Sequence, residues 1–288
     1  MFVFLIAVVA VSAAPVPPTQ QDPLLGEICM RAPHVVGLLD NWCSHKVDVC
    51  DWEGVTCVPI DLTADVDSKT TARRVAALEL IGVPLQIEMP LIMYASTQFR
   101  TLNLVNCGLT GDLGLLASGS KVAALDLSRN EQLSGFLSAG ALQTLASVVL
   151  HGSKLTADIG ELLCGSGEPF PHAKFDVSDN NLSGDLSACS GGVGQFDSVS
   201  SFNLSRNAFS GRAPVPRRAS TYDVSHNEFT SLESVRLEMR EAEPFVDSIY
   251  SIPPSSSKPK LEHCSVANNR LPIGPSPPLW VQKVKCEF

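Results

Sequence analysis

The chain has 288 residues, of which 44% are hydrophobic and 18% charged, and its formal net charge is −9. This composition suits a folded domain and is too poor in charge for a disordered chain. The acidic balance argues against a general binder of nucleic acids or anionic membranes, because such proteins need a basic face.

The N-terminal run is apolar and ends in small residues, with Val11-Ser12-Ala13 as a cleavage site. It predicts a signal peptide over residues 1–13, with an uncleaved anchor as the alternative. The run is too short to span a bilayer comfortably, and no later stretch approaches a transmembrane segment. We therefore expect an exported protein, secreted or held at the extracellular surface.

A linker and a small cap are expected to follow the signal peptide. Residues 14–28 form the linker, which is rich in Pro and Gln over Pro15 to Asp22. Residues 29–70 form an N-terminal cap, in which Cys50-Asp-Trp-Glu-Gly-Val-Thr-Cys57 is the most distinctive motif.

One line of sequence then recurs through residues 71–288. It reads apolar-x-apolar-x-x-Asn-x-apolar-Ser/Thr-Gly and is clearest from Phe202 to Gly211. The first apolar residues of the eight copies are Leu78, Leu102, Leu125, Val148, Phe175, Phe202, Tyr222 and Cys264. Their spacing lies in the twenties except before the last copy, which is the period of leucine-rich repeats.

Each position of the repeat has a mechanical reason. The two apolar residues lie on the buried face of a short strand, and successive strands must stack into a parallel sheet to share a core. The Asn follows the strand, where its amide can bond backbone groups of adjacent coils, and Cys107 takes this position in the second copy. The pattern predicts an α/β solenoid, a leucine-rich-repeat horseshoe with a concave parallel β-sheet and a disulfide-bonded N-terminal cap.

The Cys-x-Trp-x-Gly-Val-x-Cys motif, placed ahead of repeats that end in Leu-Ser/Thr-Gly, resembles plant-type leucine-rich-repeat ectodomains. That group includes receptor-like proteins and polygalacturonase inhibitors, and similar surface antigens occur in protists. The resemblance runs from about Cys29 to the C-terminus and implies recognition of a protein or glycan outside the cell. The chain departs from the group after the Gly, where Ile-Pro is replaced by pairs such as Asp112-Leu113 and Asp185-Leu186.

The repeat register sorts eight of the nine cysteines into pairs. Cys50 and Cys57 frame the tryptophan motif and should pair, which leaves Cys29 with Cys43. Cys164 and Cys189 fall on the backs of adjacent coils, within reach of a disulfide. Cys264 should pair with Cys286, which ends a predicted closing strand around Val281 and Val284. Cys107 is left as a buried thiol.

An insertion is expected at residues 231–260, before the last copy. The spacing of Leu232, Val235 and Met239 predicts a helix, and Pro253 to Pro259 reads as an exposed loop. A surface helix with a tether and a lateral loop that adds specificity both remain open.

No catalytic motif stands in a suitable context, so we predict no enzyme activity, no catalytic residue and no cofactor. A zinc site is not expected, because the chain lacks Cys-x-x-Cys and its His residues are scattered. The cluster of Asp61, Asp65 and Asp67 lacks the glycine and terminal glutamate of a calcium loop.

Binding has a better physical case, because eight or nine strands expose a strip comparable with one side of a standard protein interface. The residues expected to face a ligand there are Glu79, Asn103, Asp126, Val149, His151, Asp176, Asn203 and Asp223. The strip is mildly acidic, rich in small residues and without aromatic anchors, so it suits a basic or polar partner, and a merely solvated face is the alternative. Asn181 and Asn203 begin N-glycosylation acceptor sequences, and a glycan on Asn203 would cover part of the strip.

The sequence thus predicts a non-enzymatic extracellular recognition module for a protein or glycan, with an inhibitor of a secreted hydrolase as one version. The alternatives are a structural component of a wall or coat and, least favoured, an enzyme with an unrecognised site. Ligand and oligomeric state are left open.

Overall fold

The structure is a computed structural model that describes residues 23–59, 73–89, 99–115, 121–164, 171–191, 196, 198–216, 218–232, 262–271 and 286. The predicted signal peptide, the Asp61, Asp65 and Asp67 cluster, the helix around Val235 and Met239, and the closing strand apart from Cys286 lie outside these residues.

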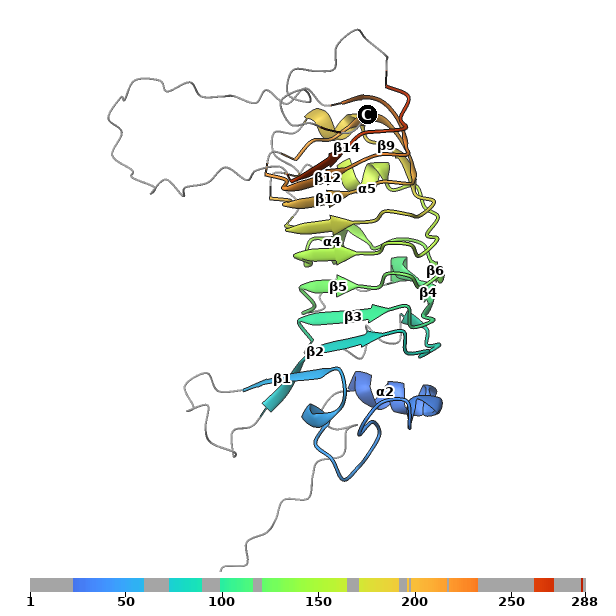
Figure 1. Cartoon of the computed structure of the whole chain (residues 1–288), viewed down its shortest axis with the longest axis vertical. Helices are drawn as coiled ribbons and strands as arrows, with labels where there is room; N and C mark the ends of the chain where they lie inside the picture. The colour runs from blue at the N-terminus through green and yellow to red at the C-terminus, as the bar shows by residue number, and fades with distance from the viewer. Residues whose placement is uncertain are drawn as a thin grey trace, which may run out of the picture.

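A nine-stranded sheet runs along the molecule like the rungs of a ladder (Figure 1). Its strands, in spatial order, are β1 (Val55–Pro59), β2 (Arg73–Ile81), β3 (Thr101–Val105), β5 (Ala124–Asp126), β7 (Ser147–Val149), β8 (Lys174–Asp176), β10 (Ser201–Asn203), β12 (Thr221–Asp223) and β14 (His263–Ser265). From β2 onward every neighbouring pair is parallel, and the first apolar residues of all eight copies lie in one register. The repeat positions read from the sequence are therefore the strand positions.

The core is built by the apolar pair of each strand. Leu78, Leu102 and Leu125 are at most 1% exposed, and Phe175 and Phe202 continue the same row. The ring of Phe202 stacks between those of Phe175 and Tyr222, with centroids about 6 Å apart on either side. No coil could bury this face alone, so the stacking of neighbours stabilises each one.

An asparagine ladder joins successive coils, as the repeat predicts. The fully buried Asn130 donates through Nδ2 to the carbonyls of Leu104 and Leu127 at 2.7 and 2.8 Å. Its Oδ1 accepts the N–H groups of Cys107 and Leu109 at 2.9 and 3.1 Å. The residues that bond the preceding coil through their amides in the same way are Asn180, Asn207, Asn227 and Asn269.

Two copies carry a shorter side chain at the ladder position. The buried thiol of Cys107 lies 3.4 Å from the carbonyls of Leu80 and Val105, and Ser153 donates to the carbonyl of Leu127 at 3.2 Å. Either side chain can replace the donor function of the amide, but neither supplies a carbonyl acceptor.

The N-terminal cap begins earlier than the sequence analysis placed it. Helix α2 (Pro23–Arg31) crosses the expected boundary at Cys29 and buries Leu24, Leu25 and Ile28, so the described cap starts at Pro23. The cap also holds the short helices η1 (Pro33–Val35) and η2 (Val49–Asp51). The buried rings of Trp42 and Trp52 pack at a centroid distance of 5.2 Å.

The cap adds a strand to the sheet that the repeat pattern does not predict. β1 lies antiparallel to β2, with Val55 paired to Leu78 and Pro59 to Arg73. Gly54, just before β1, has φ +76°, and a side chain there would overlap the backbone of Glu79, so only glycine fits this close approach.

Two small parallel sheets on a second side of the coils were also not predicted. One contains β4 (Thr110–Asp112) and β6 (Gln132–Ser134), and the other contains β9 (Ser183–Asp185), β11 (Ala208–Ala213) and β13 (Glu228–Leu232). The Ser/Thr of the Leu-Ser/Thr-Gly line donates its hydroxyl to a carbonyl of the preceding coil, as Ser134 does to Gly111 and Thr230 to Gly211. These bonds explain why that position is Ser or Thr.

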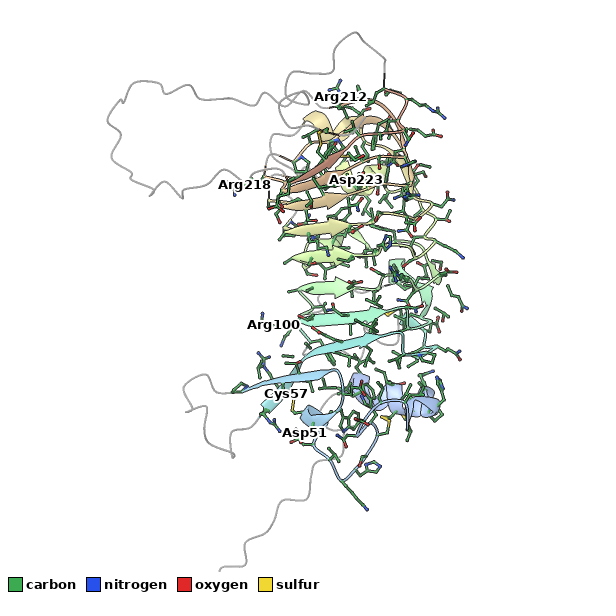
Figure 2. All side chains as sticks on the ribbon, viewed as in Figure 1. Asp51, Cys57, Arg100, Arg212, Arg218 and Asp223 are labelled. Carbon is green, nitrogen blue, oxygen red and sulfur yellow. A yellow bond between two sulfur atoms is a disulfide. The ribbon has the colours of Figure 1, made fainter. Side chains whose placement is uncertain are left out.

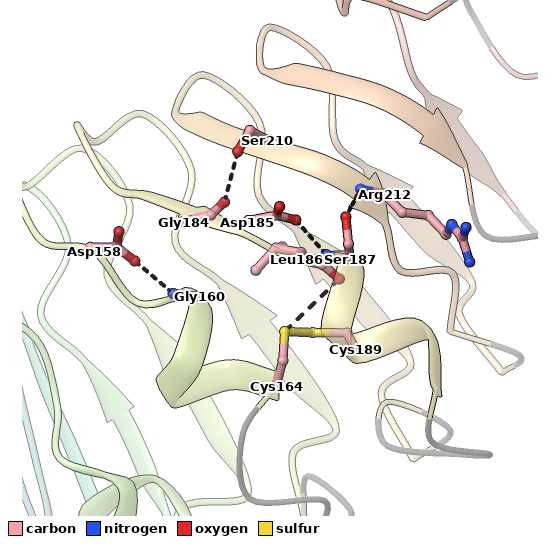
Figure 3. The surroundings of a disulfide bond; sticks show 10 residues. All are labelled: Asp158, Gly160, Cys164, Gly184, Asp185, Leu186, Ser187, Cys189, Ser210 and Arg212. Atoms are coloured by element: carbon pink, nitrogen blue, oxygen red, sulfur yellow. Dashed lines mark hydrogen bonds between the residues drawn. A yellow bond between two sulfur atoms is a disulfide. The ribbon is translucent and has the colours of Figure 1, made fainter.

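Short helices close the back of several coils, namely η3 (Leu113–Leu115), α4 (Ala139–Leu142), α5 (Gly160–Cys164) and η4 (Ser187–Gly191). Three of these helices begin just after an aspartate. Asp112 and Asp185 directly follow the Gly of the repeat, and Asp158 takes the same place in a coil that lacks this Gly. Asp112, Asp158 and Asp185 accept the N–H groups of Gly114, Gly160 and Ser187 through Oδ1 at 2.7–3.1 Å (Figure 3). The Asp-Leu pairs that replace Ile-Pro are therefore helix caps.

The four disulfides join the same cysteines that the sequence analysis paired. Cys29 is bonded to Cys43 and Cys50 to Cys57 in the cap. Cys164 at the end of α5 is bonded to Cys189 in η4, which ties two adjacent coils together (Figure 3). The fourth bond joins Cys264 on β14 to Cys286.

Candidate ligand-binding face

The predicted binding residues come together as one row across the nine-stranded sheet. Backbone pairing aligns Glu79 with Asn103, Asn103 with Asp126, and so on through Val149, Asp176 and Asn203. Asp223 and Ser265 complete the line. We call these eight residues the acidic row: Glu79, Asn103, Asp126, Val149, Asp176, Asn203, Asp223 and Ser265.

The carboxylates of the row alternate with neutral residues. Glu79, Asp126, Asp176 and Asp223 lie on β2, β5, β8 and β12, which are every second strand of the sheet. With adjacent strands about 4.8 Å apart, neighbouring carboxylates are about 9.6 Å apart along the solenoid. Figure 2 shows Asp223 on the same ladder of strands, near the C-terminal end.

One oxygen of each aspartate in the row is already engaged by its own turn. Asp126 Oδ1 accepts both the N–H and the hydroxyl of Ser128, at 3.0 and 2.6 Å. The same bonds join Asp176 to Ser178, and Asp223 accepts the N–H of Ser225. Asn203 replaces the carboxylate with an amide oxygen and keeps both bonds to Ser205, at 3.0 and 2.8 Å.

This turn is a local reason for the Asp/Asn-x-Ser sequence, and sequence analysis missed it. The sequence contains the pattern for this turn, an Asp or Asn followed two residues later by Ser, which is the spacing that an Asx turn needs. It occurs at Asp126, Asp176, Asn203 and Asp223. The residues therefore orient the backbone as well as facing outward. The hydrogen bonds of these turns engage only Oδ1 of each aspartate.

Val149 is a correction to the predicted strip. Its side chain is 8% exposed and belongs with the buried residues, as does Ser265 at 5%. An apolar side chain between two acidic strands gains more from burial than from solvent, so Val149 contributes shape and no contact of its own. The exposed or half-exposed members of the row are the other six.

Two histidines lie beside the row. His151, half-buried, has Nδ1 3.0 Å from the Ser178 hydroxyl, and its role in binding stays a prediction. His263 on β14 has Nε2 3.6 Å from Asp223 Oδ2, which makes Asp223 the one aspartate of the row with a histidine against its outer oxygen in the described residues.

The two glycosylation acceptor sequences differ in their surroundings. Asn181 is exposed beyond the strand, and its backbone N–H donates to the carbonyl of Leu155. Asn203 is half-buried within the row, and its side-chain oxygen is held by Ser205. A glycan on either residue stays a prediction.

Among the described residues, no group of three or more His, Cys, Asp or Glu side chains is arranged to hold a metal ion. Two buried titratable groups stand apart from the row. Burial raises the pKa of the Cys107 thiol to about 11 and lowers the pKa of His172 to about 4. Both lie in the core and have no access to a ligand.

The asparagine ladder, the parallel sheet of short strands and the cysteine-bonded cap together define the class of the fold: it is a leucine-rich-repeat solenoid. No family model matches the chain. A stretch of 77 residues is 31% identical to a leucine-rich-repeat receptor protein kinase of Oryza sativa subsp. japonica. That stretch is 27% of this chain and 5% of the kinase, so the chain spans a small part of that relative's length.

Solved structures of two plant proteins share features of the arrangement at low sequence identity. The crystal structure of a plant ice-binding protein is 18% identical, with a TM-score of 0.44 and coverage of 87% of both chains. The Arabidopsis receptor kinase HAESA ectodomain, solved in complex with a peptide hormone, is 16% identical, with a TM-score of 0.32 and coverage of 88% of this chain and 50% of that one. No helix among the described residues of this chain is long and apolar enough to cross a membrane.

Proposed function

We propose that the chain is an extracellular recognition module that binds a protein ligand on the acidic row and catalyses no reaction. The observation that carries the proposal is the regular placement of Glu79, Asp126, Asp176 and Asp223 on alternate strands, where each aspartate has its Oδ1 held by its own turn. The orientation of these aspartates is fixed before a ligand arrives, which lowers the entropy cost of binding.

The spacing favours a particular ligand shape. A polyproline II helix rises about 3.1 Å per residue with three residues per turn, so every third side chain lies on one face about 9.3 Å from the last. That repeat is close to the 9.6 Å between alternate strands, whereas an α-helix repeats a face every seven residues, at about 10.5 Å. The matching ligand is an extended peptide segment with Lys or Arg at every third position.

Most residues beside the aspartates of the acidic row are small or buried, so an extended segment can approach the carboxylates. Ser128, Ser178, Ser205 and Ser225 are at most 6% exposed, so they add no bulk beside Asp126, Asp176, Asn203 and Asp223. Beside Glu79, the same position holds Ile81, which is 76% exposed. On the other side of the row lie small residues such as Thr101, Ser147 and Thr221.

The test compares charge-neutral variants that preserve the turn. Asp126→Asn, Asp176→Asn and Asp223→Asn keep the Oδ1 acceptor, as the native Asn203 does, and remove three charges. Each substitution also creates an N-glycosylation acceptor sequence before Ser128, Ser178 or Ser225, so the proteins must come from a host that adds no N-glycans. The probe is a labelled peptide of four Lys-Pro-Pro units, measured by fluorescence anisotropy.

A matched control triple is Asp112→Asn, Asp158→Asn and Asp185→Asn, because these residues make the same type of turn and lie on the back of the coils. We expect the row triple to lose about tenfold in affinity, because three charge pairs of about 0.5 kcal/mol each add up to about 1.5 kcal/mol, and we expect the control to change little. A peptide of equal composition with its lysines consecutive should bind more weakly. Equal loss in both triples would refute the row as the site, and failure of every peptide would favour a structural role.

A further inference from the structure

Cations gather on the edge of the sheet where the strands begin. We call this edge the strand-entry rim: it carries Arg74, Arg100 and Lys121 on three successive coils, followed by Lys174 and Arg218. Figure 2 shows Arg100 and Arg218 at this same edge, on the left of the view, far apart along the solenoid. In the described part of the rim, Glu262 is the only acidic residue.

Backbone bonds fix the first three cations beside one another. The Arg100 N–H donates to the carbonyl of Ala76 at 2.7 Å, and the Ala123 N–H donates to the carbonyl of Arg100 at 2.8 Å. Residues 76, 100 and 123 thus lie side by side, with Arg74 two residues before the first and Lys121 two before the last. Because adjacent coils are about 4.8 Å apart, the three cations lie within about 10 Å along the solenoid axis.

Several other surface cations have an acidic partner within the described residues. Arg73 pairs with Asp48, Lys154 with Glu131 and Arg270 with Glu228. None of Arg74, Arg100, Lys121, Lys174 and Arg218 forms an ion pair with a described residue. Arg100, Lys121, Lys174 and Arg218 are exposed and Arg74 is half-exposed. Within the described residues, a chain with a net charge of −9 therefore carries a line of positive charge without ion-pair partners on one edge.

We propose that the strand-entry rim binds a linear sulfated polysaccharide. Arginine presents a planar fork that pairs with anionic oxygens, and two of the three clustered cations are arginines. A chain this acidic needs a ligand of high charge density, because the acidic row lies on the same sheet only a few residues along each strand. A sulfated glycan is also slim enough to follow the rim without covering the row.

The neighbouring acidic row weighs against the other polyanions. A nucleic-acid duplex is wide, and its phosphates would reach Glu79 and Asp126, which would repel them. An anionic membrane needs a broad basic face, whereas here the positive charge forms a single line. The rim is distinct from the row, so this proposal goes beyond the proposed function and can fail or hold independently of it.

The experiment measures binding of a heparin oligosaccharide to the intact protein by titration calorimetry at about 0.15 M ionic strength, where charges interact over about 8 Å. The test variant combines Arg74→Gln, Arg100→Gln and Lys121→Gln. The control combines Arg129→Gln, Arg206→Gln and Arg270→Gln, which removes the same charge from the edge where the strands end. Arg129 and Arg206 match the rim cations in having no ion pair with a described residue, whereas Arg270 pairs with Glu228. Far-ultraviolet circular dichroism confirms that each variant folds.

We expect the rim triple to lose about tenfold in affinity and the control to lose less than about threefold, because only the rim charges contact the glycan and each contributes a factor of about two to three. The row triple of aspartates should bind heparin as well as the natural chain or better. Equal losses in the rim and control triples, or no binding at this ionic strength, would overturn the proposal. Equal affinity for unsulfated polygalacturonate would overturn the choice of a sulfated ligand.

Discussion

Asn130 shows how much of the fold depends on one amide per coil. It is fully buried, and its side chain serves both the coil it belongs to and the preceding one. The neighbouring copies with Cys107 and Ser153 show that the position tolerates a smaller donor. In those copies the following coil's asparagine supplies the acceptor, as Asn130 does for the Cys107 N–H and Asn180 for the Ser153 N–H at 3.1 Å.

Asn130→Ala should destabilise the protein by about 3 kcal/mol or more, because it leaves the N–H groups of Cys107 and Leu109 and the carbonyl of Leu104 buried without their partner. The measurement is urea unfolding followed by circular dichroism, on protein without N-glycans. Asn181→Ala is the control, since Asn181 is exposed and bonds the structure through its backbone N–H, and we expect a change within about 0.5 kcal/mol. Similar losses in both variants would contradict the ladder's role.

The row residues illustrate what the sequence could and could not reveal. Period two was enough to place Glu79, Asp126, Asp176 and Asp223 on the outer face, and the structure puts them in register. The same rule placed Val149 there, yet its side chain is buried, because alternation gives the direction of a residue and says nothing of how closely its neighbours cover it. The sequence also could not show which carboxylate oxygen is held by the turn, because this depends on the geometry of the turn.

At the scale of elements, the aspartates that cap the back helices explain the small residues opposite them. The carboxylate of Asp185 accepts hydrogen bonds from the Ser187 side chain and from the Ser187 N–H, and these bonds, the first above all, lower the pKa of Asp185. Gly211 on β11 has φ +78°, and a Cβ atom there would overlap both the Asp185 carboxylate and the Ser187 hydroxyl. The Gly of Leu-Ser/Thr-Gly makes room for the cap of the preceding coil.

Gly211→Ala should therefore lower the free energy of unfolding by more than Gly82→Ala. Both glycines have positive φ, at +78° and +71°, but a Cβ at Gly82 meets no atom within 4 Å. The first substitution adds overlap to a backbone strain of about 1 kcal/mol that both share. Adding Asp185→Ala should recover part of the loss at Gly211, so thermal unfolding of the four proteins of this double-mutant cycle should be non-additive. Additive losses would exclude the contact.

The second side of the coils was beyond the reach of the sequence analysis. The strands β4, β6, β9, β11 and β13 are short and carry Gly and Ser, residues that do not favour strands on their own. They pair because the main sheet has already placed consecutive coils beside each other. The helix α2 was missed because its apolar block is short and directly follows a Pro-rich stretch, which favoured a linker.

At the scale of the whole molecule, one buried histidine links stability to pH. His172 is fully buried and bonds the carbonyl of Leu145 through Nδ1 at 2.7 Å. Burial lowers its pKa from 6.5 to about 4, so between these pH values His172 is neutral in the folded chain and protonated in the unfolded chain. The free energy of unfolding should therefore be unaffected by His172 above about pH 6.5. It should decrease as the pH drops from 6.5 toward 4, because the unfolded state then binds more protons than the folded state.

His172→Asn keeps a donor near the Leu145 carbonyl and removes the titration. We expect the free energy of unfolding of the natural chain to fall more than that of the variant when the pH drops from 7 to 4.5. The difference between the two falls should be at most about 3 kcal/mol, because the pKa of His172 differs between the folded and unfolded states by that equivalent. Urea unfolding at a series of pH values measures it. Parallel curves would show that His172 does not titrate with unfolding.

The antiparallel strand β1 has a consequence for the ends of the molecule. A repeat that stacks coil on coil has no internal reason to stop, and an open edge of parallel strands would template another copy of itself. β1 runs against the direction of every strand after β2, and the cap beside it is locked by Cys50–Cys57. Another copy of the repeat stacked there would therefore meet a five-residue strand of opposite direction instead of the parallel strand that every other coil offers.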